Sequence, residues 1–372
     1  MAKAENKLRW GIMSTASISR KSWKAIYHSG NGVVVAVASR DLARCGQFIA
    51  ECQAEAPFAA VPRALGNYAD LLKAEDVDAV YIPLPTGLRK EWVIRAAEAG
   101  KHVLCEKPCA VTLADLREMT AACRKNGVQF MDGVMFMHSE RLERMRKMLD
   151  DGETVGKLRR INTEFNFNAP GEFLSGNIRV HGDLEPDGCL GDQGWYCIRF
   201  TLWAMNWELP RRVSGRILTE HQRPDGGKPV PAEFTGELFF DGGVSATFYC
   251  SFVTELEERA VVSGTRGYLQ VADFVVPNAG SEIAFETGTA GLVFKGCDTI
   301  VEAKTRKWVI PEASHGQPSA QETKLFRNFA AQVLSGKLSD FWPEISLKTQ
   351  QVMEACMQSA RAGGRMVELG RG

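Results

Sequence analysis

Three polar side chains in this sequence have the types and spacing that proton transfer requires. Lys107 stands between Glu106 and Pro108 in "KHVLCEKPCAV", directly after an apolar run. Asp192 and Tyr196 lie four residues apart in "GCLGDQGWY", so on a helix they share one face. A tyrosine, whose pKa is ordinarily near ~10, is a poor base at pH ~7 unless a cation lies close to it, and a lysine ammonium supplies that charge. Lys107, Asp192 and Tyr196 are therefore the residues whose chemistry has to be weighed first against a structural role.

Each of the three also has a purely structural interpretation. A Glu–Lys pair on a surface adds little stability, and proline is common in loops. An aspartate such as Asp192 can simply place a negative charge at a helix N-terminus. A tyrosine such as Tyr196 can simply lie at the edge of a core, with its ring buried and its hydroxyl in water. The surrounding sequence has to decide between these interpretations.

A candidate phosphate-binding turn follows the first apolar run, in "GIMSTA". Gly11 and Ala16 fit the outer positions of the dinucleotide fingerprint GxGxxG/A, while Met13 occupies the position of the second glycine. Amides at a helix N-terminus bind phosphate through the backbone, and Ser14 and Thr15 can add hydroxyl donors. These five residues are candidate cofactor ligands. The alternative is a helix start capped by Ser14 or Thr15 that needs no ligand.

The end of the second apolar run indicates which dinucleotide is bound. An NAD-binding domain usually has an acidic residue there for the ribose hydroxyls, whereas this chain has Ser39 and Arg40. Ser39 can donate to a 2′-phosphate, Arg40 can pair with it, and Arg44 lies one helical turn further on. NADP is therefore favoured over NAD. The alternative is that Ser39 caps a helix and Arg40 is solvated.

The elements that must position these residues alternate between strand and helix through the first ~130 residues. Glycines end several of the helical stretches, and Thr112 is placed as a helix N-cap. This rhythm predicts a doubly wound α/β Rossmann domain with a parallel sheet over residues 1–134. The expected strands are 8–13, 32–39, 77–85, 101–106 and 128–135, and the expected helices are 19–30, 41–53, 89–100 and 112–127.

The second half of the chain is dominated by strands. After a helix at 138–152 and a strand at 158–168, two hairpins turn at Asp241-Gly242-Gly243 and near Gly264–Gly267. Sequential hairpins predict an α+β domain over residues 135–372 with a large, mostly antiparallel, open-faced sheet. The final helix, 345–362, is expected to pack back on the first domain.

The composition excludes several classes of function. Lys plus Arg and Asp plus Glu number 45 each, so no net charge draws the chain to nucleic acid or to an anionic membrane. No apolar run approaches ~18 residues, and the start has no apolar signal segment. The ten cysteines form no CxxC pair, which predicts free thiols in a reducing cytoplasm and no metal site.

Several segments together resemble one family, the oxidoreductases grouped with glucose–fructose oxidoreductase and inositol dehydrogenase. They are "WGIMSTASI", "DAVYIPLP", "AAEAGKHVLCEKP", "GCLGDQGWY" and "SLKTQQVMEACMQSAR", so the resemblance covers essentially the whole chain. "VASRDLARC" and "GIMSTA" resemble the NADP-using branch that includes dimeric dihydrodiol dehydrogenase and xylose dehydrogenase. The resemblance implies that Lys107 lies at the carboxyl end of the fourth strand beside the nicotinamide, directed by Pro108, often in a cis linkage. It makes Tyr196 the general acid/base, and Asp192 the residue that orients the substrate or the Tyr–Lys pair.

The same resemblance extends the candidate site. It adds Pro83, Leu84, Pro85, Leu88 and Glu106 to the cofactor-binding residues. Arg179 and His181, in the polar loop "GNIRVHGDLEPDG", are candidate substrate contacts beside Lys107, Asp192 and Tyr196. The chain departs from the family at Thr86-Gly87-Leu88-Arg89, where Asn-x-x-His is common, and at "FMHSER", which leaves His138 near the domain junction. Arg89 can reach a phosphate, the substrate or water, and His138 is more simply a structural hydrogen-bonding residue.

These observations predict an NADP-dependent oxidoreductase that transfers hydride between a nicotinamide and a secondary alcohol or carbonyl of a sugar, polyol or cyclic diol. Two alternatives stay open, namely redox-assisted glycoside cleavage and a non-catalytic nucleotide-binding regulator or scaffold of the same fold. An open sheet face must be solvated or paired, and the family resemblance implies sheet-to-sheet association, so a homodimer or homotetramer is expected.

Overall fold

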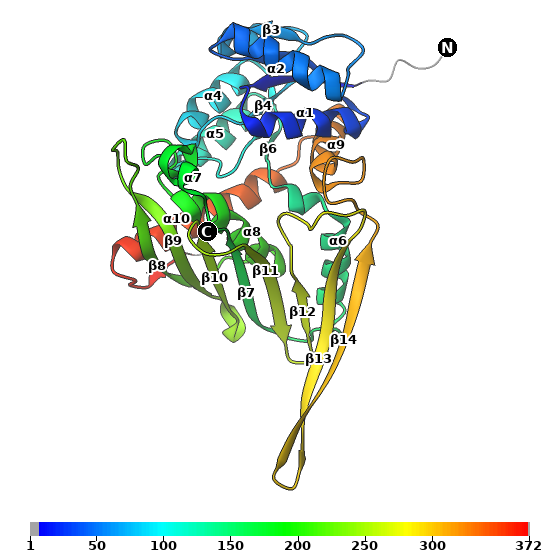
Figure 1. The fold of residues 1–372 in the computed structure, drawn as a ribbon, viewed down its shortest axis with the longest axis vertical. Coiled ribbons are helices and arrows are strands. Elements are labelled where there is room, and N and C mark those ends of the chain that lie inside the picture. Colours follow the sequence, from blue (N-terminus) through cyan, green and yellow to red (C-terminus); the bar gives the residue numbers. More distant parts are fainter. Residues whose placement is uncertain (1–6, 371–372) are drawn as a thin grey trace. The chain divides into compact units, whose positions relative to one another are not determined.

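The computed structural model describes residues 7–370, which divide by their contacts into two compact units (Figure 1). The first unit holds the chain up to His138 together with Asp183–Glu185 and His315–Gln350. The second holds Ser139–Gly182, Pro186–Ser314 and the chain from Gln351 onward. A single boundary at residue 134 stays a prediction.

The first unit is built on a six-stranded parallel sheet with the order β3-β2-β1-β4-β5-β6. The chain moves outward from β1 in one direction and then returns to start again at β4, so the strand order reverses between these two strands. Ligands bind at the carboxyl ends of parallel strands at such a switch point. The strands are β1 (Leu8–Met13), β2 (Gly32–Ala38), β3 (Arg63–Leu65), β4 (Ala79–Ile82), β5 (His102–Cys105) and β6 (Phe130–Asp132).

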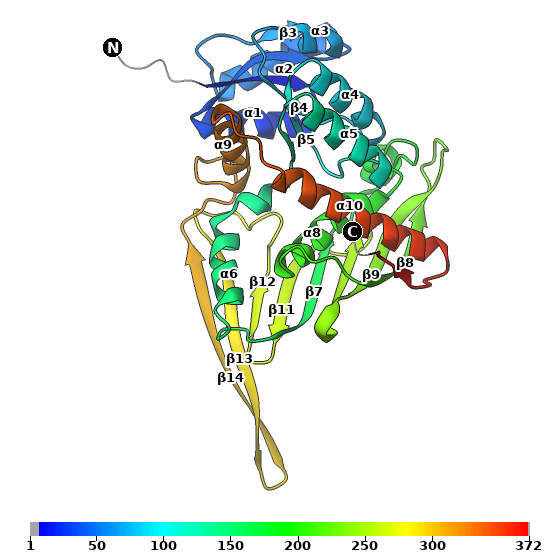
Figure 2. The same cartoon turned by 180° about the vertical axis from the view of Figure 1, so that it is seen from behind.

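Helices cover this sheet in two groups. α1 lies beside α9, and α4 lies beside α5 (Figures 1 and 2). The first group shares a core with the sheet in which Trp10 contacts Phe326 at 5.2 Å and Phe329 at 5.1 Å between ring centroids. The helices are α1 (Ser17–Ser29), α2 (Leu42–Glu55), α3 (Tyr68–Lys73), α4 (Thr86–Glu98), α5 (Leu113–Lys125), the short η1 (Met135–His138) and α9 (Gln321–Leu334).

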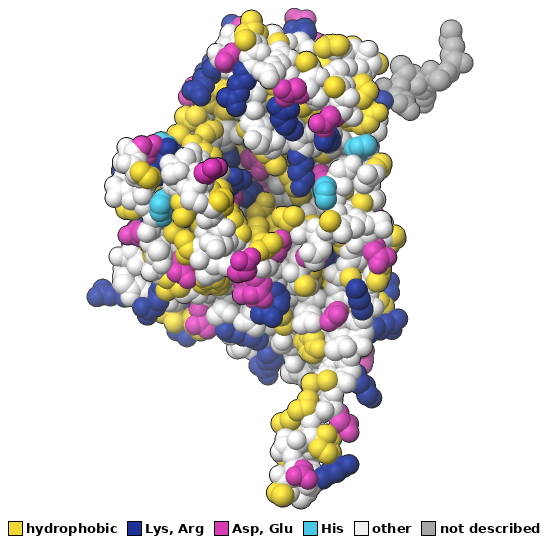
Figure 3. Space-filling model, in the orientation of Figure 1, with side chains coloured by type: hydrophobic (Ala, Val, Ile, Leu, Met, Phe, Trp, Pro, Cys, Tyr) yellow, Lys and Arg dark blue, Asp and Glu magenta, His cyan; other side chains and the backbone are white. Residues whose placement is uncertain are grey.

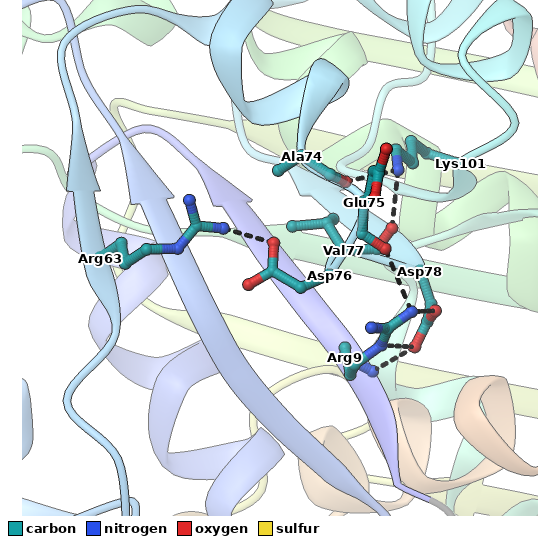
Figure 4. Close-up of polar contacts among 8 residues, drawn as sticks. All are labelled: Arg9, Arg63, Ala74, Glu75, Asp76, Val77, Asp78 and Lys101. Carbon is teal, nitrogen blue, oxygen red and sulfur yellow. Dashed lines mark hydrogen bonds and ion pairs between the residues drawn. The ribbon is translucent and has the colours of Figure 1, made fainter.

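Ion pairs hold the amino ends of these strands, at the opposite end from the expected site (Figure 4). Arg9 at the start of β1 donates to Asp78 at 2.6 and 2.9 Å, just before β4. Lys101, just before β5, donates to the carbonyls of Ala74 and Val77 at 2.7 and 2.8 Å. Burial tends to raise the pKa of Asp78, but the hydrogen bonds from Arg9 outweigh it and leave that pKa lowered. These contacts thus stabilise the amino ends of the strands and do not involve the carboxyl ends, where a ligand is expected to bind.

The second unit is built on a nine-stranded sheet with the order β14-β13-β12-β11-β7-β10-β9-β8-β15. β7 and β10 run parallel, and the other neighbouring strands pair antiparallel. The strands are β7 (Leu158–Asn166), β8 (Arg212–His221), β9 (Val230–Phe239), β10 (Ser245–Ser251), β11 (Glu257–Gly264), β12 (Tyr268–Val271), β13 (Ile283–Lys295), β14 (Asp298–Ile310) and β15 (Val367–Glu368).

Helices of this unit contact one face of the sheet, and buried residues alternate with exposed ones along the strands. The other face, which we call the open face, carries polar and charged side chains from β7, β9, β11 and β13. The predicted fold class, a Rossmann domain followed by an α+β domain with an open-faced sheet, is confirmed. The helical segments are α6 (Glu140–Asp150), α7 (Gly171–Gly176), η2 (Ile178–Val180), η3 (Leu190–Gly194), α8 (Trp195–Ala204), η4 (Asp241–Gly243) and α10 (Phe341–Arg361), whose second half belongs to this unit.

None of the helices within residues 7–370 has the length and apolar character that crossing a bilayer requires.

Candidate active site

The turn after β1 keeps bulky side chains away from a bound ligand. Met13, which replaces the second glycine of the fingerprint, is completely buried, so its side chain lies in the core rather than on the turn. Gly11 has no room for a side chain, because a Cβ there would lie 2.9 Å from the Leu71 side chain. The departure from the fingerprint at Met13 therefore does not obstruct a phosphate.

The start of α1 presents its backbone amides to the same turn. Ala16 is the N-cap and has no side-chain group to cap the helix, while Thr15 beside it is only partly buried. Ser14 has a φ of 135°, and its Oγ accepts a hydrogen bond from the Ala16 amide at 3.1 Å. The first amides of α1 are thus left without a side-chain cap, which suits a pyrophosphate. The residues present fit a dinucleotide.

The structure at the end of β2 shows whether Ser39 caps a helix, which was the alternative to phosphate binding. Asp41, not Ser39, is the N-cap of α2, since its carboxylate accepts from the Arg44 amide at 3.0 Å. The Ser39 hydroxyl accepts weakly from the Asp41 amide at 3.3 Å, and Ser39 is 8% exposed. Arg40 is exposed at the carboxyl end of the strand. Ser39 and Arg40 are therefore not needed for capping and remain available to a 2′-phosphate.

Tyr68 is a residue of this region that the sequence did not single out. It begins α3, and a side-chain hydrogen bond joins it to Ser14. Burial raises its pKa, while the nearby Arg40 charge and the bond to Ser14 act in the opposite direction. Its ring meets Trp92 edge-on at 5.1 Å. Tyr68 is thus close enough to both Ser14 and Arg40 for each of them to act on its pKa.

Arg89 ties together the carboxyl ends of β4 and β5. It is 5% exposed, and its Nε donates to the Leu84 carbonyl at 2.7 Å. Its Nη1 donates to the Pro108 carbonyl. The sequence allowed contacts of Arg89 with a phosphate, the substrate or water. The contacts found here are with two backbone carbonyls instead. Pro83 and Leu84 are buried, Pro85 is partly buried, and Leu88 is 38% exposed.

A buried tyrosine, Tyr81, supports the Glu106-Lys107-Pro108 turn through a hydrogen bond to Glu106. The Tyr81 hydroxyl donates to the Glu106 carboxylate at 2.6 Å, and the Lys107 amide donates to the same carboxylate at 3.3 Å. Burial, and next to it the Glu106 charge, raise the pKa of Tyr81 well above its usual value. A Cβ on Gly133 would lie 2.9 Å from Glu106, so only glycine fits there. The Lys107–Pro108 bond is cis, as the resemblance implies, and Lys107 is 9% exposed.

A carboxylate from the loop before Asp192 caps α4 beside this turn. Glu185 accepts from the Thr86 amide at 2.9 Å and from the Thr86 hydroxyl at 2.6 Å. The next amide, of Gly87, donates to the Leu184 carbonyl at 2.9 Å. α4 has no cap of its own, because its N-cap is Pro85. Glu185 therefore supplies the cap that the local sequence lacks.

In the second unit, Asp192 and Arg179 form an ion pair. Arg179 Nε donates to the Asp192 carboxylate at 2.9 Å, and the Asp192 side chain is 15% exposed. Tyr196 follows one turn later and is partly buried, with its ring edge against Phe165 at 5.8 Å. Asp192 lies in the π-helical turn Leu190–Gly194, which runs directly into α8. His181, two residues after Arg179, is also partly buried.

An aromatic cluster continues from the residues around Tyr196. Phe167 contacts Phe173 at 5.3 Å and Phe252 at 5.5 Å between ring centroids, and Phe173 contacts Phe252 at 5.3 Å. Phe167 stands just beyond the end of β7, two residues after Phe165. Phe165 contacts the Tyr196 ring, and the other three rings form an apolar cluster that begins where β7 ends. This cluster leaves no local pattern in the sequence, because its members come from three separate segments.

Gln193 and His138 are two buried polar side chains with different surroundings. Gln193 is completely buried beside Asp192, and within the described chain neither of its amide atoms has a hydrogen-bond partner. His138 stacks on Trp342 at 4.7 Å and contacts the Asn328 amide at 3.1 Å. A structural role accounts for His138, whereas Gln193 is a buried polar group of the kind found at functional sites.

Two family models match the chain in sequence order. Residues 8–134 match "Oxidoreductase family, NAD-binding Rossmann fold", and residues 142–270 match "GFO/IDH/MocA C-terminal domain". Trans-1,2-dihydrobenzene-1,2-diol dehydrogenase of Bos taurus is 34% identical over 268 residues, which cover 72% of this chain and 74% of the relative. D-xylose 1-dehydrogenase (NADP(+)) 2 of Haloferax volcanii is 31% identical, and the match covers 75% of this chain and 81% of the relative.

Solved structures agree with this grouping. KijD10, a 3-ketoreductase from Actinomadura kijaniata in complex with NADP and TDP-benzene, has a TM-score of 0.78 at 26% identity, covering 95% of this chain and 98% of KijD10. The aldose–aldose oxidoreductase of Caulobacter crescentus shares the fold, with a TM-score of 0.79 at 23% identity and coverage of 98% and 100%. The predicted resemblance and its branch are confirmed. This chain belongs to the oxidoreductase family that joins an NAD-binding Rossmann domain to a GFO/IDH/MocA C-terminal domain.

Proposed function

We propose that this chain is an NADP-dependent oxidoreductase that interconverts a secondary alcohol and a carbonyl on a sugar or cyclic diol. The observation that carries the proposal is the position of Lys107. It lies at the carboxyl end of β5, nearly buried, in a turn fixed by Glu106, Tyr81 and Arg89. A buried ammonium at that end of a Rossmann sheet is placed to act on a charge that develops beside the cofactor.

The cofactor accepts hydride from the substrate as NADP⁺ or donates it as NADPH. On this chain, the turn from Gly11 to Ala16 would hold the pyrophosphate, and Ser39 with Arg40 would hold the 2′-phosphate. Tyr68 would close the space between them, since it is bonded to Ser14 and lies near Arg40. The relatives support this choice of cofactor, because the xylose dehydrogenase is named for NADP and the 3-ketoreductase is seen with it.

Tyr196 would move the proton. During oxidation the phenol oxygen takes the proton of the substrate hydroxyl, and during reduction it returns that proton to the nascent alkoxide. Lys107 would favour the phenolate and stabilise the alkoxide by its positive charge. Asp192, which Arg179 holds by an ion pair, would accept a second substrate hydroxyl. Arg179 and His181 would supply further hydrogen bonds to the substrate.

The side chains around Tyr196 support a ring-shaped substrate that carries hydroxyl groups on one face. Arg179, His181 and Asp192 offer hydrogen bonds, while Phe165 and Phe167 offer an apolar surface. A pyranose or a cyclic diol presents both kinds of surface at once. The names of the relatives include one of each kind, a dihydrodiol dehydrogenase and a xylose dehydrogenase.

The proposal extends to assembly and compartment. The open face of the second unit would be covered by another copy, giving a homodimer or homotetramer. All ten cysteines are free thiols and nine are buried, which agrees with a cytoplasmic location.

The test is Tyr196→Phe, assayed with NADP⁺ against a panel of aldoses and trans-dihydrodiols. The phenyl ring keeps the contact with Phe165, so the variant should fold. We expect kcat to fall by at least about 100-fold while the Kd for NADPH stays within about threefold of wild type. Unchanged turnover in this variant would remove the proton-transfer role. Release of an aglycone without net change in NADPH would favour glycoside cleavage instead.

A further inference from the structure

β13 and β14 project beyond the sheet as a two-stranded arm (Figures 1 and 2). The two strands are 13 residues each and pair along their whole length, from Ile283↔Ile310 to Lys295↔Asp298. β12 pairs with β13 only at its root, and the last of these pairs is at Gly288. We call the segment from Gly288 to Thr305 the arm. An isolated two-stranded hairpin is at best marginally stable in water, so the arm needs further contacts.

One face of the arm is uncharged and apolar. The facing pairs on it are Ala290↔Ala303, Leu292↔Val301 and Phe294↔Thr299. Leu292 is 61% exposed, Phe294 70% and Val301 64%. The opposite face carries the charged residues Lys295, Asp298, Glu302 and Lys304. We call the uncharged face, formed by these three pairs, the arm strip. Figure 3 shows hydrophobic side chains along the arm.

The arm strip continues the open face of the sheet. Side chains alternate along a strand, so residues two apart share a face. Glu286↔Lys307 at the root is therefore on the same face as the strip. Glu286 accepts a hydrogen bond from Gln270 at 2.8 Å across the open face, next to a recess of about 590 Å³ that Arg259 also lines.

The arm strip is too small to hold a partner alone. Three pairs at the spacing of β-strands cover about 200 Å². A stable protein interface needs about 800 Å² from each partner. The nine-stranded open face, at about 40 Å across and about 20 Å high, offers that area. The strip must therefore act as an extension of the open face.

The charges on the open face fit a second copy of the same surface as the partner. Arg259 pairs with Glu164 at 2.8 Å, and Arg160 pairs with Glu237 at 3.3 Å. Because positive and negative groups are matched within the face, two copies can meet without net repulsion, as an isologous interface requires. The chain as a whole has no net charge that would draw nucleic acid or an anionic membrane to the strip.

We propose that the arm strip docks on a second copy of this chain and extends an open-face dimer, in which the arm acts as a clasp. This inference rests on the open-face association given under the proposed function. It adds that Leu292, Phe294 and Val301 contribute to the dimer through one face of the arm, and that the other face does not.

The test compares two variants of the arm by sedimentation velocity over a wide range of concentrations. The strip variant carries Leu292→Thr, Phe294→Thr and Val301→Thr, which removes apolar surface while keeping residues that favour strands. The control carries Val293→Thr and Ile300→Thr, a facing pair on the opposite side of the same arm. We expect the dimer dissociation constant of the strip variant to rise at least about tenfold, and that of the control to stay within about threefold.

Two further variants separate failure of the arm from failure of the dimer. Arg259→Glu places three acidic groups together on the open face, next to Glu164 and Glu257, and should dissociate the dimer whatever the arm does. A shortened arm, with residues 291–302 replaced by Asn-Gly between Ala290 and Ala303, should match the strip variant even if the triple substitution disturbs folding.

Three results would overturn the proposal. A strip variant that dimerises like wild type, while Arg259→Glu dissociates, removes the clasp and keeps the open-face dimer. Equal weakening in the strip variant and the control assigns the effect to the arm as a whole and not to this face. A wild-type protein that is monomeric at every concentration removes both the clasp and the dimer, and binding of the strip to neutral phosphatidylcholine vesicles would then assign it to a membrane.

Discussion

Arg89 shows how a single buried side chain can fix the direction of another. Its guanidinium donates to the Leu84 carbonyl, just after β4, and to the Pro108 carbonyl, just after Lys107. The family commonly has a histidine at this place, which has fewer donors than a guanidinium. These two contacts to backbone carbonyls make Arg89 a positioning residue for the Lys107 turn.

We expect Arg89→Ala to lower kcat by at least about tenfold. The substitution leaves two buried carbonyls without their donor, which also costs roughly 1–3 kcal/mol of stability. Arg89→Lys keeps one donor and should restore part of kcat. The readout is kcat against the Kd for NADPH, measured well below the unfolding temperature. Arg95→Ala is the matched control, because Arg95 is on the same helix and its guanidinium contacts side chains, Glu91 at 3.0 Å and the Trp92 ring at 4.3 Å, and not the carbonyls beside the Lys107 turn. A kcat for Arg89→Ala equal to that of the control would contradict the positioning role.

The sequence could identify residues whose chemistry is visible in a short motif, and it missed those defined by distant contacts. Lys107 and Tyr196 stand in motifs that can be recognised. Glu185 caps α4 at Thr86 from 99 residues away, and Ser14 acts on the pKa of Tyr68 from a separate segment, so neither contact leaves a local pattern. Met13 looked like a defect in the fingerprint because the sequence does not show that its side chain is buried.

At the scale of elements, prediction succeeded for most strands and helices of the first unit up to β6, and it missed others, among them the core-facing α9. The expected strand at 8–13 matches β1, and Thr112 caps α5 by accepting from the Asp115 amide at 3.1 Å. β13 and β14 were not predicted. Beyond Gly288 they face no core, so their apolar residues do not alternate with polar ones in the way that marks a half-buried strand. The exposed apolar side chains of the arm strip therefore break the alternation of apolar and polar residues by which a half-buried strand is recognised.

A hydrogen bond joins Glu258 on β11 to the segment after β12, and it leads to a prediction of how stability depends on pH. Glu258 on β11 is 8% exposed, and its carboxylate accepts from the Val276 amide at 2.6 Å. Burial raises the pKa of Glu258 to about 7, although the Val275 and Val276 amides oppose the shift. An unfolded glutamate has a pKa near ~4.3, so between that value and about 7 the folded chain holds a proton that the unfolded chain has lost. The free energy of unfolding from this group therefore falls as the pH rises through the window.

We expect Glu258→Gln to remove this pH dependence. Relative to wild type, the variant should gain stability by up to about 3 kcal/mol between pH ~5 and pH ~8, because the amide cannot ionise. Urea unfolding of both proteins across that range measures the difference. Groups such as His102, whose pKa is lowered by burial, are common to both proteins and cancel. A difference in stability that does not change with pH would contradict the assignment to Glu258.

At the scale of the whole molecule, the proposed chemistry is divided between two units. Lys107 and the cofactor turn belong to the first unit, while Asp192 and Tyr196 belong to the second. The two family models divide the chain in the same order. Asp183–Glu185 and His315–Gln350 come from the second half of the chain but belong to the first unit, and Glu185 caps α4 there.

The most direct measurement is a titration of the wild-type protein and of Arg40→Ala with NADPH and NADH, followed by energy transfer from tryptophan to nicotinamide. We expect wild type to bind NADPH at least about tenfold more tightly than NADH, and the preference to shrink in Arg40→Ala, because the guanidinium pairs with the 2′-phosphate. Equal affinity of wild type for the two would remove the role of Ser39 and Arg40. Failure to bind either nucleotide would contradict the central claim that this chain is a nicotinamide-dependent oxidoreductase.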